Sequence, residues 1–270
     1  MLLDIIKEAT DLQTMYKAAP DKVNMLVYGD KGSGKTTLVT TAPRPILFDS
    51  FDDGGTLSII DEIREGWILA DTRWEKDDPV RADTWQKWLK EMDRRIQSGL
   101  FNSMATYALD SLTVLQQISM NFVLRMKGRA DGIPQVGKQG DNDYVTSQTG
   151  IERIITKILD LPCNVIITAH PDLSQEEGTK KLFIGPAVTG ALKTRLPILF
   201  SEFYYAKSEV GKEGKQIYSL LTRPDSIFRA TTRLGRKGRF EMWEQPNIKA
   251  LMKKAGLPAE DKSMPWLEKK

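Results

Sequence analysis

The 270-residue chain contains very little cysteine or histidine: there is one of each, Cys163 and His170. A single cysteine excludes a disulfide within the chain, and one Cys with one His cannot supply the ligands of a zinc site. Free thiols are the rule in reducing compartments. We therefore expect a protein of such a compartment, with neither a disulfide framework nor a zinc centre.

Long apolar runs are also missing. No stretch approaches the ~18 apolar residues that cross a bilayer. The first residues, MLLDIIKEATDLQ, carry Asp4 inside their apolar stretch and have no basic start, unlike a secretory signal. We therefore expect no membrane association and a cytoplasmic location.

The composition lacks the marks of a disordered chain, because 40% of residues are hydrophobic and 28% charged, with a net charge of only +3. The positive charge is concentrated in residues 171–270, which hold 19 basic and 12 acidic side chains. It is densest at residues 229–239, RATTRLGRKGR. Such a run is typical of a solvated loop, and so small a net charge does not by itself indicate a nucleic-acid binder.

Short apolar segments alternate with segments of helical periodicity. The pattern predicts buried strands at residues 23–28, 46–48, 105–109 and 165–169. It predicts helices at residues 1–18, 35–41, 82–97, 112–126, 146–161 and 248–255. This alternation indicates an α/β fold with a mostly parallel central sheet and helices on both faces.

Later segments predict an antiparallel hairpin near the C-terminus. Strands are expected at residues 200–206 and 215–222, joined by a glycine-containing turn. Two polar stretches, 127–143 and 171–187, are predicted to be long loops. We divide the chain into an N-terminal helical arm, a core, and a C-terminal helix with a tail, at residues 1–21, 22–243 and 244–270.

Residues 29–36, GDKGSGKT, match the phosphate-binding pattern G-x-x-x-x-G-K-[ST] at every fixed position. The motif follows an apolar strand and opens a helix, so loop amides and the helix N-terminus would point at a bound phosphate. Lys35 is expected to reach the β- and γ-phosphates, and the Thr36 hydroxyl to coordinate Mg²⁺. We assign the nucleotide contacts to Gly29, Asp30, Lys31, Gly32, Ser33, Gly34, Lys35, Thr36 and Thr37.

Carboxylates follow two other predicted strands. Asp110 ends the strand at 105–109 and is predicted to be the second Mg²⁺ residue, acting through water, although an Asp here is also an ordinary helix N-cap. The strand at 46–48 leads into DSFDDGG, where a carboxylate would orient the attacking water. Asp52 is the first choice for that role and Asp53 the second, with a solvent-exposed acidic turn as the alternative.

The strand at 165–169 ends at His170, the only histidine. Ligands of open α/β sheets bind at the carboxyl ends of the strands. His170 is therefore a candidate sensor of the γ-phosphate, with a purely structural histidine as the alternative.

Together these pieces resemble the RecA-like ATPases, in the order phosphate loop, acidic strand end, Asp-Ser strand end and polar sensor strand. Here they read GDKGSGKT, LFDSFDDGG, YALDS and VIITAH. More narrowly, the chain is similar to phage-encoded AAA-domain nucleotide-binding proteins related to RecA, a group that includes phage single-strand annealing ATPases. That similarity covers residues 22–235 and is carried by LPCNVIITAH, GPAVTGALKTRLPILFSEFYYA and LLTRPDSIFRATTR.

The resemblance implies a RecA-like P-loop core that hydrolyses ATP with Mg²⁺ and assembles into a ring or filament. In such assemblies a basic residue near the end of the core reaches the neighbour's γ-phosphate. Arg233 is the best match and Arg229 the next, while Thr231 stands where relatives often have lysine. An arginine there would neutralise charge in the transition state.

The resemblance also implies single-stranded DNA as a partner, bound by two loops that correspond here to residues 127–143 and 172–187. Few aromatic residues lie there, so we expect salt-sensitive contacts along the phosphate backbone rather than base stacking. The basic residues of these loops are Lys127, Arg129, Lys138, Lys180 and Lys181.

Two other functions stay open. One is a nucleotide-dependent loader with little hydrolysis, which would place a single-strand-binding or other replication protein on DNA. The other is a small-molecule kinase, because kinases share the phosphate loop. The sequence shows no lid-like arginine-rich segment and no second substrate site, which disfavours the kinase.

Overall fold

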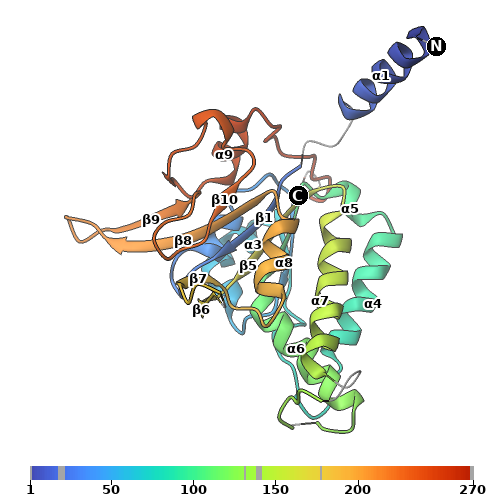
Figure 1. Ribbon diagram of the computed structural model, residues 1–270, viewed down its shortest axis with the longest axis vertical. Coiled ribbons are helices and arrows are strands. Elements are labelled where there is room, and N and C mark those ends of the chain that lie inside the picture. The colour runs from blue at the N-terminus through green and yellow to red at the C-terminus, as the bar shows by residue number, and fades with distance from the viewer. Residues whose placement is uncertain (1, 18–21, 131, 138–141, 177, 268–270) are drawn as a thin grey trace.

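The computed structural model describes residues 2–17, 22–130, 132–137, 142–176 and 178–267 (Figure 1). Within these residues one sheet has the strand order β11-β9-β8-β1-β5-β4-β2-β3, and β10 pairs with β8. Its parallel strands are β1 (Asn24–Tyr28), β2 (Ile46–Ser50), β3 (Ile68–Asp71), β4 (Thr106–Asp110), β5 (Asn164–Ala169) and β8 (Glu202–Val210). The antiparallel strands are β9 (Gln216–Leu221), β10 (Thr231–Thr232) and β11 (Trp243–Glu244).

The predicted fold class is therefore confirmed: a mostly parallel central sheet is extended by antiparallel strands from the C-terminal part of the chain. The carboxyl ends of β1, β2, β4 and β5 lie along one edge of the sheet. For example, Ser50 at the end of β2 pairs with Asp110 at the end of β4. This edge gathers the phosphate loop and the polar residues that end the other strands.

Helices cover both faces of the sheet, because alternate side chains of the buried strands point to opposite sides. In β1, Leu26 and Tyr28 belong to one apolar core, and Met25 and Val27 belong to the other. The first core is covered by α4 (Thr84–Gln97), α5 (Leu100–Ser103), α6 (Leu112–Met126), α7 (Asp143–Leu159) and α8 (Leu192–Leu199). The second is covered by α2 (Lys35–Val39), α3 (Ile60–Glu65) and α9 (Ile248–Ala255).

The predicted loop at residues 171–187 is wrong. The structure has an antiparallel ribbon there, made of β6 (Pro171–Gln175) and β7 (Leu182–Pro186), which is separate from the main sheet. Its residues are mostly half-buried or exposed, and Leu173 is 61% exposed. Only the end of β7 is buried, and the half-buried Ile184 beside it packs against the first core. The rest of the ribbon has no alternating apolar face, so its sequence carries little strand signal.

Several other elements also differ from the predictions, among them the short helices α3 and α5 and the two-residue strands β10 and β11, which were not predicted. Strand β3 and helix α8 were not predicted: β3 has only four residues, and α8 contains Pro197. Helix α7 begins at Asp143, three residues before the predicted start. Its N-cap is Asn142, whose side-chain oxygen accepts a hydrogen bond from the Val145 amide at 3.2 Å.

The C-terminal part of the chain packs on the sheet. Ile248, Leu251 and Met252 of α9 lie in the second core with Leu38 and Val39 of α2. Strand β11 pairs with β9 immediately before this helix. The arm formed by β8 and β9 extends beyond the body of the molecule (Figure 1).

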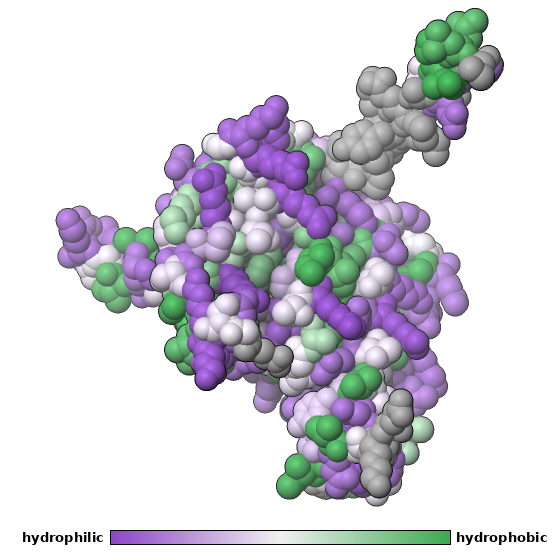
Figure 2. All heavy atoms as spheres, viewed as in Figure 1, coloured by the Kyte–Doolittle hydropathy of each residue, from purple (hydrophilic) through white to green (hydrophobic). Residues whose placement is uncertain are grey.

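Helix α1 (Leu2–Lys17) lies apart from the sheet and its covering helices in Figure 1. Its described apolar side chains are exposed, and Figure 2 shows them as a green group at the end of the molecule. Among the described residues, none of the helices has the length and apolar character that a bilayer span requires.

Candidate nucleotide-binding site

The phosphate loop joins β1 to α2, and its glycines are required by its geometry. Gly34, the residue before α2, has a φ of 83°, in the left-handed region that favours glycine. A Cβ at Gly29 would lie 2.2 Å from the carbonyl oxygen of Ala206 in β8. The loop can therefore pass close to β8 and turn into the helix only with these residues.

Lys35 holds its ammonium group inside the loop. Its Nζ donates hydrogen bonds to the carbonyl oxygens of Gly29 at 2.7 Å and Asp30 at 2.9 Å. Burial lowers the pKa of Lys35, while the nearby carboxylates of Asp110 and Asp52 act in the opposite direction. A phosphate bound in the loop would meet this cation.

Ser33 supplies a test of whether a phosphate fits. Its side chain is 4% exposed, and its Oγ has no hydrogen-bond partner among the described residues. Buried hydroxyl groups are normally satisfied. A hydroxyl without a partner inside a loop of this sequence suits a phosphate oxygen, so the residues present fit a bound nucleotide.

Thr36 and Asp110 lie together, as predicted for a magnesium site. The Thr36 hydroxyl donates to Asp110 Oδ2 at 2.7 Å, and the Thr168 hydroxyl donates to Oδ1. Burial raises the pKa of Asp110, and the two hydroxyl hydrogen bonds oppose that rise. A hydroxyl and a carboxylate are oxygen ligands of the kind that Mg²⁺ prefers.

The described residues hold no group of three or more His, Cys, Asp and Glu side chains arranged as a metal cluster. Mg²⁺ usually keeps several waters and shares its other coordination positions with substrate phosphates. Thr36 and Asp110 would thus hold the ion in the company of the nucleotide.

Asp52 forms a hydrogen-bonded chain between two other strand ends. Its Oδ1 accepts a hydrogen bond from Ser111 Oγ at 2.7 Å, and its Oδ2 lies 3.0 Å from His170 Nε2. Burial acts to raise the pKa of Asp52, but the hydrogen bonds from His170 and Ser111 lower it below its usual value. The carboxylate is therefore ionised and held in place.

Most predicted site residues line one cavity of 650 Å³. Its wall contains Lys31, Gly32, Gly34, Lys35, Thr36, Thr37, Asp52, Asp53, Gly54, Gly55, Leu57, Ser58, Asp110, His170 and Tyr218. The structure thus brings the phosphate loop, the two acidic strand ends and the histidine together. Gly29, Asp30 and Ser33 belong to the loop but not to this wall.

Sequence reasoning missed several residues of the site, including Ser58 in the cavity wall and Thr168 beside Asp110. Ser111 donates a hydrogen bond to Asp52. The only sign of this in the sequence is that Ser111 directly follows Asp110. Leu57, in the short helix η1 (Gly55–Ile59), and Tyr218, in β9, come from elsewhere in the chain. No local pattern could have joined them to the phosphate loop.

Arg233 and Arg229 do not reach this cavity in their own chain. The Arg233 guanidinium donates to the carbonyl oxygen of Ile198 at 2.9 Å, and its main-chain amide donates to Glu202 at 3.0 Å. Glu202 is at the amino end of β8, whereas the cavity lies at the carboxyl ends of the parallel strands. The Arg229 guanidinium lies 3.4 Å from the ring centre of Phe183. A role in a neighbour's site stays a prediction for both arginines.

Two basic residues of the first predicted DNA loop are occupied by an ion-pair network. Lys127 Nζ and Arg129 Nη2 lie 2.9 Å and 2.7 Å from Asp143 Oδ1. Lys180 and Lys181 are exposed between β6 and β7. Lys138 lies outside the described residues.

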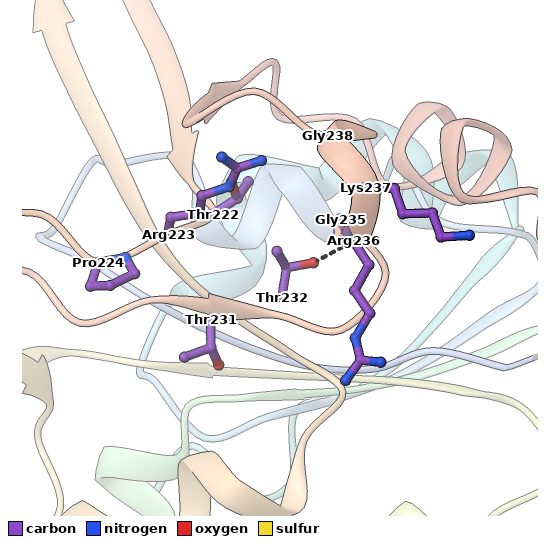
Figure 3. Close-up of a pocket in the computed structure, with 9 residues that line it drawn as sticks. All are labelled: Thr222, Arg223, Pro224, Thr231, Thr232, Gly235, Arg236, Lys237 and Gly238. Atoms are coloured by element: carbon purple, nitrogen blue, oxygen red, sulfur yellow. Dashed lines mark hydrogen bonds between the residues drawn. The ribbon is translucent and has the colours of Figure 1, made fainter.

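A second cavity, of 480 Å³, lies beside the basic run (Figure 3). It is lined by Thr222, Arg223, Pro224, Thr231, Thr232, Gly235, Arg236, Lys237 and Gly238. No acidic residue contributes to this wall. Figure 3 shows the side chains of Arg236 and Lys237 leaving their loop in different directions, so they do not converge on one small anion.

A loop that presents a lysine and a threonine at a helix start, beside a buried aspartate, defines a P-loop NTPase. A family model described as AAA domain matches residues 21–234, and the chain belongs to this AAA-domain family of P-loop NTPases. No curated protein matches the chain.

Proposed function

We propose that this protein is a Mg²⁺-dependent ATPase that assembles with copies of itself on single-stranded DNA and acts in phage recombination or annealing, in the host cytoplasm. The observation that carries the ATPase part is the convergence of Lys35, Thr36, Asp110 and Asp52 on one cavity. The choice of ATP, the DNA and the phage setting are supported by the resemblance of the sequence to RecA-like ATPases.

The side chains have distinct roles in this proposal. Lys35 offsets charge on the β- and γ-phosphates, and bound Mg²⁺, held by Thr36 and Asp110, would supply further neutralisation. Asp52 is ionised and fixed by Ser111 and His170, so it can accept a hydrogen bond from the attacking water and orient it. The contact of His170 with Asp52 joins the end of β5 to that carboxylate.

The distribution of charge supports single-stranded DNA as the partner. The C-terminal hundred residues carry the excess of basic side chains. Arg236 and Lys237 are exposed and form no ion pair or hydrogen bond through their side chains among the described residues. Divergent, unpaired cations suit an extended phosphate backbone better than a single anion.

The test is steady-state ATP hydrolysis with and without single-stranded DNA, at two salt concentrations, with duplex DNA as the control. We expect stimulation by single strands that weakens as salt rises, because each phosphate contact releases counterions. Lys35→Ala should abolish hydrolysis, and full activity of that variant would reject the site. Charge removal at Arg236 and Lys237 should weaken DNA stimulation while leaving basal hydrolysis unchanged.

A loader that hydrolyses little ATP is the second candidate. It is favoured by one observation: Thr231 stands where relatives often have lysine, so the chain lacks part of the basic pattern expected of an arginine that acts in a neighbour's site. If the protein binds ATP but turns it over slowly with or without DNA, this function is preferred. The search would then turn to a single-strand-binding or replication protein as the partner.

A further inference from the structure

The nucleotide cavity is polar around the phosphate loop but has two apolar side chains at its rim. Tyr218 is 40% exposed and Leu57 is 73% exposed. Among the described residues of the cavity wall, Tyr218 is the only phenylalanine, tyrosine or tryptophan.

These two side chains come from elements beside helix α2. The Tyr218 ring covers the start of the helix, since its Cδ1 lies 3.0 Å from the place that a Cβ would take at Gly34. Leu57 belongs to η1, which packs against α2. Both residues line the same cavity as Thr36 and Thr37, which open the helix.

A nucleoside triphosphate has two chemically different parts. Its phosphates match the loop amides and Lys35, whereas its base and sugar present flat, largely apolar surfaces. Nucleotide sites usually combine a few placed polar groups with apolar and aromatic walls. A half-exposed tyrosine stacks on any base, because every base has a π-face.

We propose that Tyr218 and Leu57 form an apolar clamp for the nucleoside part of the ligand, so that the site selects nucleoside triphosphates over bare polyphosphate. The arm formed by β8 and β9 thereby contributes a wall of the nucleotide site. This proposal rests on nucleotide binding by the phosphate loop.

The test compares equilibrium binding of ATP and of inorganic tripolyphosphate, both with Mg²⁺, by titration calorimetry. Tyr218→Ala should weaken ATP binding about tenfold, in line with a lost base–aromatic stack, and leave tripolyphosphate binding unchanged. Leu57→Ala should weaken ATP alone by a smaller factor, and Tyr218→Phe should bind ATP like the parent chain. Ile217→Ala is the matched control, because the neighbouring residue of β9 points to the opposite face and is not in the cavity wall.

The outcomes separate the clamp from the site itself. If the parent chain binds neither ligand, the nucleotide site is rejected. If it binds both, and Tyr218→Ala weakens both equally or neither, the clamp is rejected while the site stands. A loss of ATP binding in Ile217→Ala as large as that in Tyr218→Ala would also reject the clamp, because it would show a general effect on the arm.

Discussion

At the scale of single residues, Asp52 is the group whose surroundings favour a chemical role. Ser111 and His170 each contact one of its carboxylate oxygens, and the main chain adds a third restraint, because the Phe51 amide donates to the Asp110 carbonyl at 2.6 Å. Fixed orientation is what a water-orienting carboxylate needs, since misplacement by an ångström is costly in rate. Asp53, the other candidate, is exposed, and within the part of the chain that the structure describes no hydrogen bond restrains its side chain.

Asp52→Asn should lower kcat by a factor of about 10² to 10⁴, the range for loss of an acid–base or water-orienting group. The amide keeps the shape of the side chain but loses the negative charge, so KM for ATP should change little. Steady-state kinetics that separate kcat from KM make this measurement. Asp53→Asn is the control and should behave like the parent chain; the reverse pattern would transfer the role to Asp53.

The buried thiol of Cys163 supplies a second prediction about a single residue. Cys163 is 4% exposed, and burial raises the pKa of its thiol to about 12. At pH 8 the folded protein should react with iodoacetamide at least about a hundredfold more slowly than the unfolded chain, because the thiolate is the nucleophile. Labelling followed by mass spectrometry, with and without denaturant, measures the ratio. Equal rates would show that the thiol is accessible in the folded state.

At the scale of elements, the buried strands could be predicted and the exposed ribbon could not. β1, β4 and β5 are short apolar runs whose alternate residues enter the two cores, so their sequence carries the signal. Helix α8 buries only Leu192 and Leu196 and contains Pro197, which argues against a helix in any local analysis. β6 and β7 are held together by backbone hydrogen bonds, and most of their side chains do not enter a core. Their sequence therefore has no alternating apolar pattern.

The same distinction applies to the site. The phosphate loop and Asp110 could be predicted because their spacing and their place after a strand are properties of the local sequence. The hydrogen bonds that Ser111 and His170 make to Asp52 depend on the order of β2, β4 and β5 in the sheet. Tyr218 depends on an arm about 180 residues further along the chain, so only the tertiary structure places it over Gly34.

The start of helix α7 supplies a prediction about an element. Asp143, its first residue, is fully buried and is contacted by Arg129, Lys127 and the Gln135 amide. Burial acts to raise its pKa, but the Gln135 amide and the two cations lower it to about 2, against a usual 3.8. A lowered pKa contributes stability that is fully present above the usual value and is lost as the pH falls towards the folded value.

Asp143→Asn should therefore destabilise the protein by about 1 to 3 kcal/mol at pH 7, the range for hydrogen bonds to a charged group. The difference from the parent chain should shrink as the pH falls from 4 to 2. Urea unfolding midpoints across this range measure it. Asp160→Asn, at the exposed end of the same helix, is the control. A difference that stays constant between pH 4 and pH 2 would contradict the ion-pair account.

At the scale of the whole molecule, helix α1 is the feature that the single chain does not explain. Leu2, Leu3, Ile5 and Ile6 are between 54% and 80% exposed. Neither apolar core of the described residues includes a residue of α1. Grouped apolar side chains at a protein surface usually mark a site of association. The proposed self-assembly would give this helix a partner in a second copy of the chain.

The double substitution Leu3→Glu with Ile6→Glu should reduce the mass of the assembly, measured by light scattering after size-exclusion chromatography with ATP and single-stranded DNA. Two charges in a buried interface would oppose association, whereas ATP binding should be unchanged because α1 contributes no residue to the cavity wall. Lys7→Glu, which changes charge on the same helix without removing an apolar side chain, should assemble like the parent chain. An unchanged mass accompanied by a lower melting temperature would instead show that α1 packs on its own chain, and a parent chain that stays monomeric with both ligands would reject self-assembly.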